Sequence, residues 1–161
     1  MQSYSIREVV EMALRTEKLG HEFYTGMSEK FSSEQGLKDL FTLLATMELK
    51  HERIFTGILG KISGNEPIDP GEWNEALNYL RAMMESQFFL GREKSLPNLD
   101  RIKTVVEAID FAIGFEKETT LFFTGMKASV SESDRPLVDE IIEEEMRHIA
   151  ILTKFRESLE S

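Results

Sequence analysis

The chain has 161 residues, of which 41% are hydrophobic and 30% charged, and its formal net charge at pH 7 is −10. This composition is typical of one folded globular domain over 1–161, because a chain of this length can bury a single core. The acidic excess disfavours nucleic acid and anionic membranes as partners, since both attract clustered Lys and Arg. The absence of cysteine excludes disulfides and thiolate metal sites within the chain.

No apolar run in the sequence reaches the ~20 residues that a membrane-spanning helix needs. The first residues also lack the basic start and apolar stretch of an export signal. We therefore expect a cytoplasmic protein.

The first predicted element is a helical hairpin over 5–62. Ser5-Ile-Arg-Glu8 is a capping box, which begins a helix. Apolar residues spaced by three and four continue this helix to about Phe31. A short polar break precedes a second helix from about Leu37 to Ile62, and so short a connection predicts antiparallel neighbours.

A crossover follows over 63–103. Turn-forming residues at 64–71 and a break at 95–99 enclose a helical pattern over about 72–90. The crossover is long enough to return the chain along the first hairpin, as in bundles with one long connection. Its additional helix either covers the bundle or packs on a second subunit.

The second hairpin, 104–160, repeats the first. Thr104-Val-Val-Glu107 is another capping box, a third helix begins near Val105 with a stripe reaching Val130, and a fourth begins near Pro136. Residues 5–27 align with 104–126 without a gap and share eight identities in 23 positions. This internal duplication predicts an all-α four-helix bundle made of two equivalent hairpins.

Each hairpin carries a glutamate on its first helix and a Glu-x-x-His motif on its second. A Glu and a His three residues apart lie on the same face of a helix. All of these residues fall in the middle of apolar stripes: Glu17, Glu48, His51, Glu116, Glu145 and His148. Two Glu-x-x-His helices and two single-Glu helices form the ligand set of a dinuclear carboxylate centre in a four-helix bundle.

Burying four carboxylates together is costly, because each loses hydration and repels the others. Two divalent cations would balance the four negative charges, with two neutral imidazoles completing the set. Iron suits these ligands and can change oxidation state, and manganese and zinc remain alternatives. By symmetry, we expect Glu48 and Glu145 to bridge two irons, with Glu17 and Glu116 terminal and one histidine on each ion.

Three further residues are candidates for supporting roles. Tyr24, two turns after Glu17, is the candidate catalytic residue, because its phenol can hydrogen-bond a ligand carboxylate; the alternative is a packing role. His21 is expected to be a surface histidine rather than part of the site. Glu144 is expected to be a solvated carboxylate rather than a partner of the His148 ring.

The motifs Glu17-Lys-x-x-x-x-Phe-Tyr24, Glu48-x-x-His51, Glu116-Lys-x-x-x-x-Phe-Phe123 and Glu145-x-x-His148 make the chain similar to the rubrerythrin branch of the ferritin-like superfamily. The resemblance implies a ferritin-like bundle with a non-haem diiron centre that reacts with peroxide or dioxygen, or oxidises ferrous iron. It also implies a homodimer or larger homo-oligomer.

The sequence departs from typical rubrerythrins at two points. The chain ends at Ser161 without the cysteines of a rubredoxin domain, so a separate electron donor is expected. Typical members also have a glutamate one turn after the third-helix ligand, where this chain has Thr119. We therefore expect a diiron oxidoreductase, with an iron-storage protein and a helical scaffold holding a structural metal as alternatives.

Overall fold

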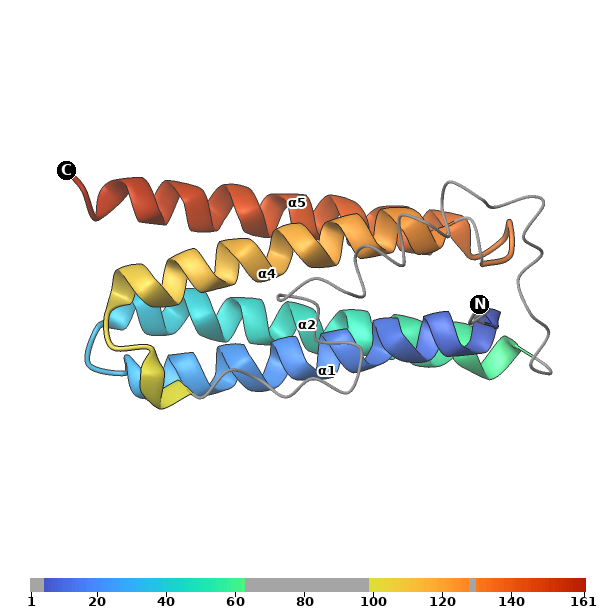
Figure 1. The fold of residues 1–161 in the computed structure, drawn as a ribbon, viewed down its shortest axis with the longest axis horizontal. Coiled ribbons are helices and arrows are strands. Elements are labelled where there is room, and N and C mark those ends of the chain that lie inside the picture. The colour runs from blue at the N-terminus through green and yellow to red at the C-terminus, as the bar shows by residue number, and fades with distance from the viewer. Residues whose placement is uncertain (1–4, 63–98, 128–129) are drawn as a thin grey trace.

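The described residues form four long α-helices, paired in two antiparallel hairpins (Figure 1). A computed structural model describes residues 5–62, 99–127 and 130–161. The helices are α1 (Ile6–Lys30), α2 (Gln35–Lys61), α4 (Val105–Met126) and α5 (Arg135–Ser158), and a short 3-10 turn, η1 (Leu99–Arg101), precedes α4. The helix expected over 72–90 and most of the crossover lie outside the described residues.

Both predicted capping boxes are confirmed. At the start of α1 the Ser5 hydroxyl accepts from the Glu8 amide at 3.2 Å, and the Glu8 carboxylate accepts from the Ser5 amide at 2.7 Å. Thr104 and Glu107 repeat this exchange at the start of α4, at 3.1 and 3.0 Å. Each box satisfies amide groups that the first turn of a helix leaves without partners.

The end of the third helix differs from the expected stripe. α4 ends at Met126, and Val130 is buried in the turn before α5 instead of continuing the helix. The fourth helix begins at Arg135, with Pro136 in its first turn as expected.

The two hairpins lie side by side, α1 against α4 and α2 against α5. In Figure 1, α2 ends at one end of the bundle and α4 begins at the other. The turn η1 is tied to the end of α1, where the Lys30 ammonium donates to the Leu99 carbonyl at 2.8 Å.

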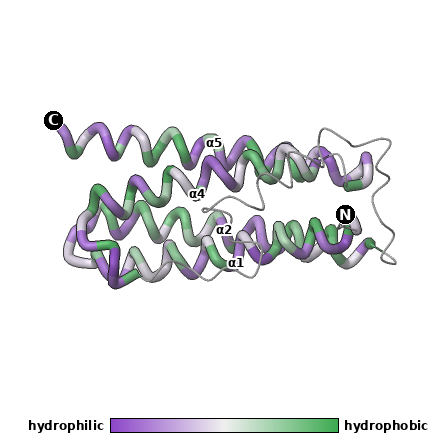
Figure 2. The backbone as a smooth tube through the Cα atoms, in the orientation of Figure 1, coloured by the Kyte–Doolittle hydropathy of each residue, from purple (hydrophilic) through white to green (hydrophobic). Residues whose placement is uncertain are grey.

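The apolar core is divided into two clusters along the bundle. One contains Val10, Phe55, Phe123 and Ile141, and the other contains Phe23, Met27, Phe41 and Phe115, together with their neighbours. Apolar and polar residues alternate along every helix, as Figure 2 shows, so each helix contributes one face to this core. The middle of the bundle, between the two clusters, is occupied by polar side chains.

None of the helices in the described part of the chain combines the length and the apolar character needed to cross a bilayer.

Candidate metal centre

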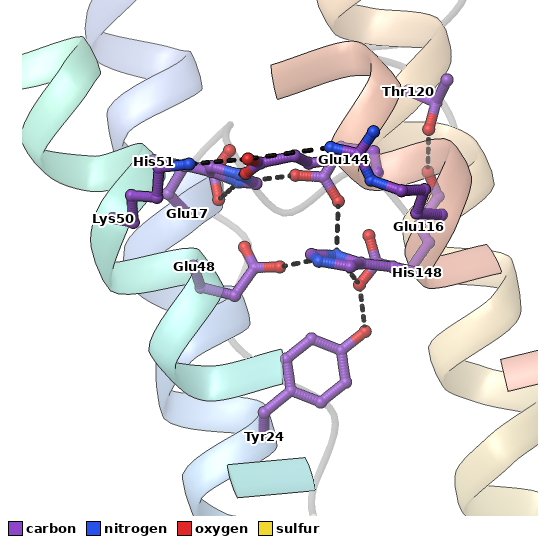
Figure 3. A network of polar contacts seen from close by, with 11 residues as sticks. Glu17, Tyr24, Glu48, Lys50, His51, Glu116, Thr120, Glu144 and His148 are labelled. Carbon is purple, nitrogen blue, oxygen red and sulfur yellow. Dashed lines mark hydrogen bonds and ion pairs between the residues drawn. The ribbon is translucent and has the colours of Figure 1, made fainter. Parts of the chain in front are cut away.

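The six predicted ligands converge at mid-bundle. Figure 3 labels all of them except Glu145, and the labelled ones point toward one another from all four helices. α1 contributes Glu17 and α4 contributes Glu116; the remaining four are Glu48 and His51 from α2, and Glu145 and His148 from α5. Five of these side chains are fully buried and His148 is 4% exposed. The structure brings together the whole set, and the role of its members as ligands stays a prediction.

The six side chains fall into two overlapping groups, in each of which one ligand atom per residue lies within 4.8 Å of the others. The first group is Glu17, Glu48, His51 and Glu145, and the second is Glu116, Glu145, His148 and Glu48. Exchanging the two hairpins converts one group into the other. Glu48 and Glu145 belong to both groups, which is the arrangement that two bridging carboxylates require.

Each imidazole directs Nδ1 into the cluster. Nδ1 of His51 lies 2.8 Å from Oε1 of Glu145 and 3.5 Å from Oε2 of Glu17. Nδ1 of His148 lies 3.2 Å from Oε2 of Glu145 and 3.5 Å from Oε1 of Glu116. The two rings are nearly parallel, with centroids 5.9 Å apart. One nitrogen ligand therefore faces each group.

Several buried polar atoms in this cluster make no well-directed hydrogen bond with the described residues, although Nδ1 of His51 and Oε1 of Glu145 lie 2.8 Å apart. They are both carboxylate oxygens of Glu17 and Glu48, Oε2 of Glu116, Oε1 of Glu145 and Nδ1 of His51. Buried polar atoms in native proteins are normally satisfied, because an unpaired one costs about 1–3 kcal/mol. Oxygen and imidazole donors directed at shared points fit two divalent cations such as iron or manganese.

Burial shifts the pKa of the carboxyl groups in the cluster. Loss of hydration raises the pKa of Glu17 and of Glu48 well above the usual range, and in Glu48 the neighbouring carboxylates add to this rise. Burial and the charge of Glu145 raise the pKa of Glu116 to about 8. Without cations, these shifts favour the protonated form of the three carboxyl groups.

Glu145 is the exception among the four. Burial opposes its ionisation, but its contacts with Glu116, His148 and His51 outweigh that effect and hold its pKa below the usual range. Burial by itself would lower the pKa of both imidazoles, yet the adjoining carboxylates raise it to about 9 in His51 and about 10 in His148. Bound cations would displace these protons, because metals bind neutral imidazole and ionised carboxylate.

Tyr24 is fully buried, and its hydroxyl donates a hydrogen bond to Oε1 of Glu116 (Figure 3). The phenol thus reaches across from α1 to the carboxylate on α4, not to Glu17 on its own helix. Burial and the charges of Glu116 and Glu48 raise the pKa of Tyr24 well above its usual value, so it remains a donor. This contact positions Glu116; a catalytic role for Tyr24 stays a prediction.

The expectation that Glu144 is a solvated carboxylate is wrong. Glu144 is only 6% exposed, and its Oε2 accepts a hydrogen bond from Nε2 of His51 at 2.6 Å. The Lys50 ammonium donates to Oε1 at 2.6 Å. Glu144 therefore supports the histidine of α2 rather than His148 on its own helix, a pairing that depends on how α2 and α5 pack.

His21 lies outside both groups, partly buried, with Nδ1 donating to the Ala45 carbonyl at 2.8 Å. It lines a surface hollow of about 290 Å³ between α1 and α2.

Gly20 provides the space that the Glu48 carboxylate occupies. A Cβ atom built on Gly20 would lie 2.7 Å from Oε2 of Glu48 and 3.0 Å from the Phe115 ring. The equivalent position in the second hairpin is Thr119, which is buried. A side chain at position 20 would therefore move a carboxylate shared by both groups.

Gly20→Ala is expected to lower the affinity for divalent cations roughly tenfold or more, the scale seen when a supporting contact of a metal ligand is lost. Gly57→Ala is the matched control, because Gly57 is an exposed glycine within α2 and nothing lies within 4 Å of its added Cβ. Both substitutions favour the helix by roughly 0.5–1 kcal/mol. A difference in cation affinity between the two variants therefore reports the displacement of the Glu48 carboxylate. Calorimetric titration with Co²⁺ measures the affinity of each variant, and equal affinities in Gly20→Ala and Gly57→Ala would contradict the role of Gly20.

The comparisons with known proteins agree with this geometry. The Rubrerythrin family model matches residues 8–156. A protein from Thermotoga maritima, assigned as a ferritin-like diiron-carboxylate protein, has a crystal structure that matches with a TM-score of 0.74. The two chains share 21% sequence identity over 98% of this chain and 97% of the other. No curated protein sequence matches.

The structural match confirms the ferritin-like four-helix fold, and the family model covers all four helices and all six residues of the cluster. The chain belongs to the rubrerythrin family.

Proposed function

We propose that this chain is a non-haem diiron oxidoreductase that reduces peroxide or dioxygen. The observation that supports the proposal best is the buried cluster of six ligand-type side chains, several of whose facing atoms have no hydrogen-bond partner among the described residues. Two bound irons would supply the redox chemistry, because each can exchange one electron. Manganese and zinc fit the same donors, but zinc could not supply electrons.

The residues around the cluster have three tasks in this proposal. Glu48 and Glu145 would hold both ions at a fixed separation, since each lies in both groups. Glu17 and Glu116 would each neutralise one ion and adjust their orientation as its charge changes. The two apolar clusters on either side exclude bulk water, which strengthens every charge interaction in the site.

Reduction of peroxide to two waters takes up two electrons and two protons. We propose a separate electron donor, and a homodimer or larger assembly acting in the cytoplasm. The two protons would come from solvent, because bound cations displace those of the ligands, and Tyr24 keeps its proton while it orients Glu116.

The test begins with the metal-free protein, loaded with two ferrous ions per chain without oxygen. Peroxide and dioxygen are then added in separate experiments, and oxidant consumption and the near-ultraviolet absorption are followed. We expect one peroxide consumed per chain in each cycle, with activity restored by an added reductant. The Glu48→Gln variant should show neither signal.

Two other outcomes would replace the proposal. Uptake of many irons per chain into a multi-subunit particle would identify a storage protein. An unchanged melting temperature on chelation, with no oxidant consumed above the level of the Glu48→Gln variant, would identify a helical scaffold.

A further inference from the structure

The two halves of the cluster are related by the internal duplication, but their supporting residues are not. We call the half that contains Glu17 and His51 position one, and the half that contains Glu116 and His148 position two. Glu48 and Glu145 serve both. If the supporting residues were also duplicated, the two positions would bind a cation equally well.

In position one, the imidazole is held by a hydrogen bond, and the oxygens of the Glu17 carboxylate accept none from the described residues. Glu144 accepts from Nε2 of His51 at 2.6 Å, which leaves Nδ1 without a proton once a cation binds there. Both oxygens of Glu17 lack hydrogen-bond partners among the described residues. This half therefore offers a fixed imidazole tautomer and a carboxylate with its full donor capacity.

The described residues give position two neither feature. Alignment of Glu48 with Glu145 places Met47 where the second hairpin has Glu144, and a thioether is only a weak acceptor. Tyr24 donates to Oε1 of Glu116, whereas its counterpart in the second hairpin, Phe123, has no hydroxyl to offer Glu17. One oxygen of the terminal carboxylate is thus already engaged in this half.

The hydrogen bond between His51 and Glu144 favours position one. A histidine whose second nitrogen donates to a carboxylate is a better oriented and more basic ligand. The Lys50 ammonium at 2.6 Å and Arg147 at 3.8 Å reduce the charge of Glu144, but the hydrogen bond to His51 remains.

We propose that the two positions bind cations in a fixed order, position one first and with higher affinity, because Glu144 supports His51 whereas the equivalent position in the first hairpin is Met47. The inference rests on the proposed function only in assuming that the cluster binds two divalent cations. A chain with one ion would then hold it at Glu17 and His51. The second ion would be the one that exchanges more readily.

Titration of the metal-free protein with Co²⁺, followed by calorimetry and visible absorption, tests the order. Two steps are expected, separated by roughly tenfold or more in affinity. His148→Ala should retain the tighter step and lose the weaker one, and His51→Ala should do the reverse. A His51→Ala variant that keeps the tighter step would overturn the order.

Two further substitutions test the cause. Glu144→Ala should weaken the tighter step by roughly 10–100-fold and leave the other unchanged, and Glu144→Gln, which keeps an acceptor, should restore part of the loss. Glu140→Ala is the matched control, because Glu140 also contacts Lys50, at 3.6 Å, but is exposed and makes no contact with His51. Equal losses in both steps would contradict the assignment.

A gain of affinity provides a test that misfolding cannot imitate. Met47→Glu places a carboxylate at the position equivalent to Glu144. In the alignment of the two hairpins Arg147 is equivalent to Lys50, so a cationic residue is also present at the matching position. The weaker step should strengthen and approach the tighter one. Two equal steps in the unmodified protein would refute this inference but not the proposed function, whereas the absence of Co²⁺ binding would refute both.

Discussion

Glu48→Gln is expected to remove both metal ions from the protein, whereas Glu17→Gln is expected to remove only one. Glu48 is a member of both ligand groups, and Glu17 belongs to one. The carboxamide keeps the volume of the side chain but carries no charge and cannot bridge two cations. The loss at each position should exceed the roughly 10–100-fold that follows removal of a supporting hydrogen bond.

Metal content per chain, measured after dialysis against a weak chelator, distinguishes the two variants. We expect about two ions in the unmodified protein, about one in Glu17→Gln and close to none in Glu48→Gln. Glu145→Gln should resemble Glu48→Gln, since Glu145 lies near both imidazoles, 2.8 Å from His51 and 3.2 Å from His148. Equal metal content in Glu17→Gln and Glu48→Gln would contradict the sharing of Glu48.

The helices and the converging residues could be predicted from the sequence because both depend on local patterns. A capping box occupies four consecutive residues, and a stripe of apolar residues follows from 3.6 residues per turn. The duplicated hairpin then fixes which residues are equivalent, so Glu17 implies Glu116 and His51 implies His148. Their depth at mid-bundle follows because each lies midway along its helix.

The contacts between helices could not be predicted in this way. Glu144 neighbours Glu145 in the sequence and is therefore turned by about 100° from it on α5, which suggests a solvated side chain. It is buried because α2 packs beside α5 and brings His51 and Lys50 to it. That contact depends on the rotation of one helix about its axis relative to the other, which a single-helix pattern does not contain.

The same limit applies to Gly20. Its place on the core stripe of α1 predicts close packing, but not that Oε2 of Glu48 fills the position of the missing Cβ. The hydrogen bond from Tyr24 to Glu116 similarly depends on the packing of α1 against α4. The duplication predicts the features that the two halves share. Tyr24 and Glu144 have no equivalent in the other hairpin, where Phe123 and Met47 stand, and they make the site asymmetric.

Cation binding is expected to raise the melting temperature by roughly 10–20 °C. The metal-free bundle buries four carboxyl groups and two imidazoles between its apolar clusters, and bound cations would replace their protons and unpaired atoms with bonds. A cation at 100 times its dissociation constant stabilises the folded state by about 2.7 kcal/mol per site. Each kcal/mol shifts the melting temperature of a chain of this size by roughly 2–4 °C.

Scanning calorimetry with excess Co²⁺ and with a chelator measures this increment, and Glu48→Gln is the decisive control. Burial raises the pKa of Glu48 well above its usual value, which favours the neutral form of that carboxyl in the metal-free protein. Replacing it with a neutral amide of the same shape should therefore leave the metal-free melting temperature nearly unchanged while removing the increment. An increment of equal size in this variant would mean that the cations stabilise the fold from somewhere other than the cluster, and the six converging side chains would lose their assigned role.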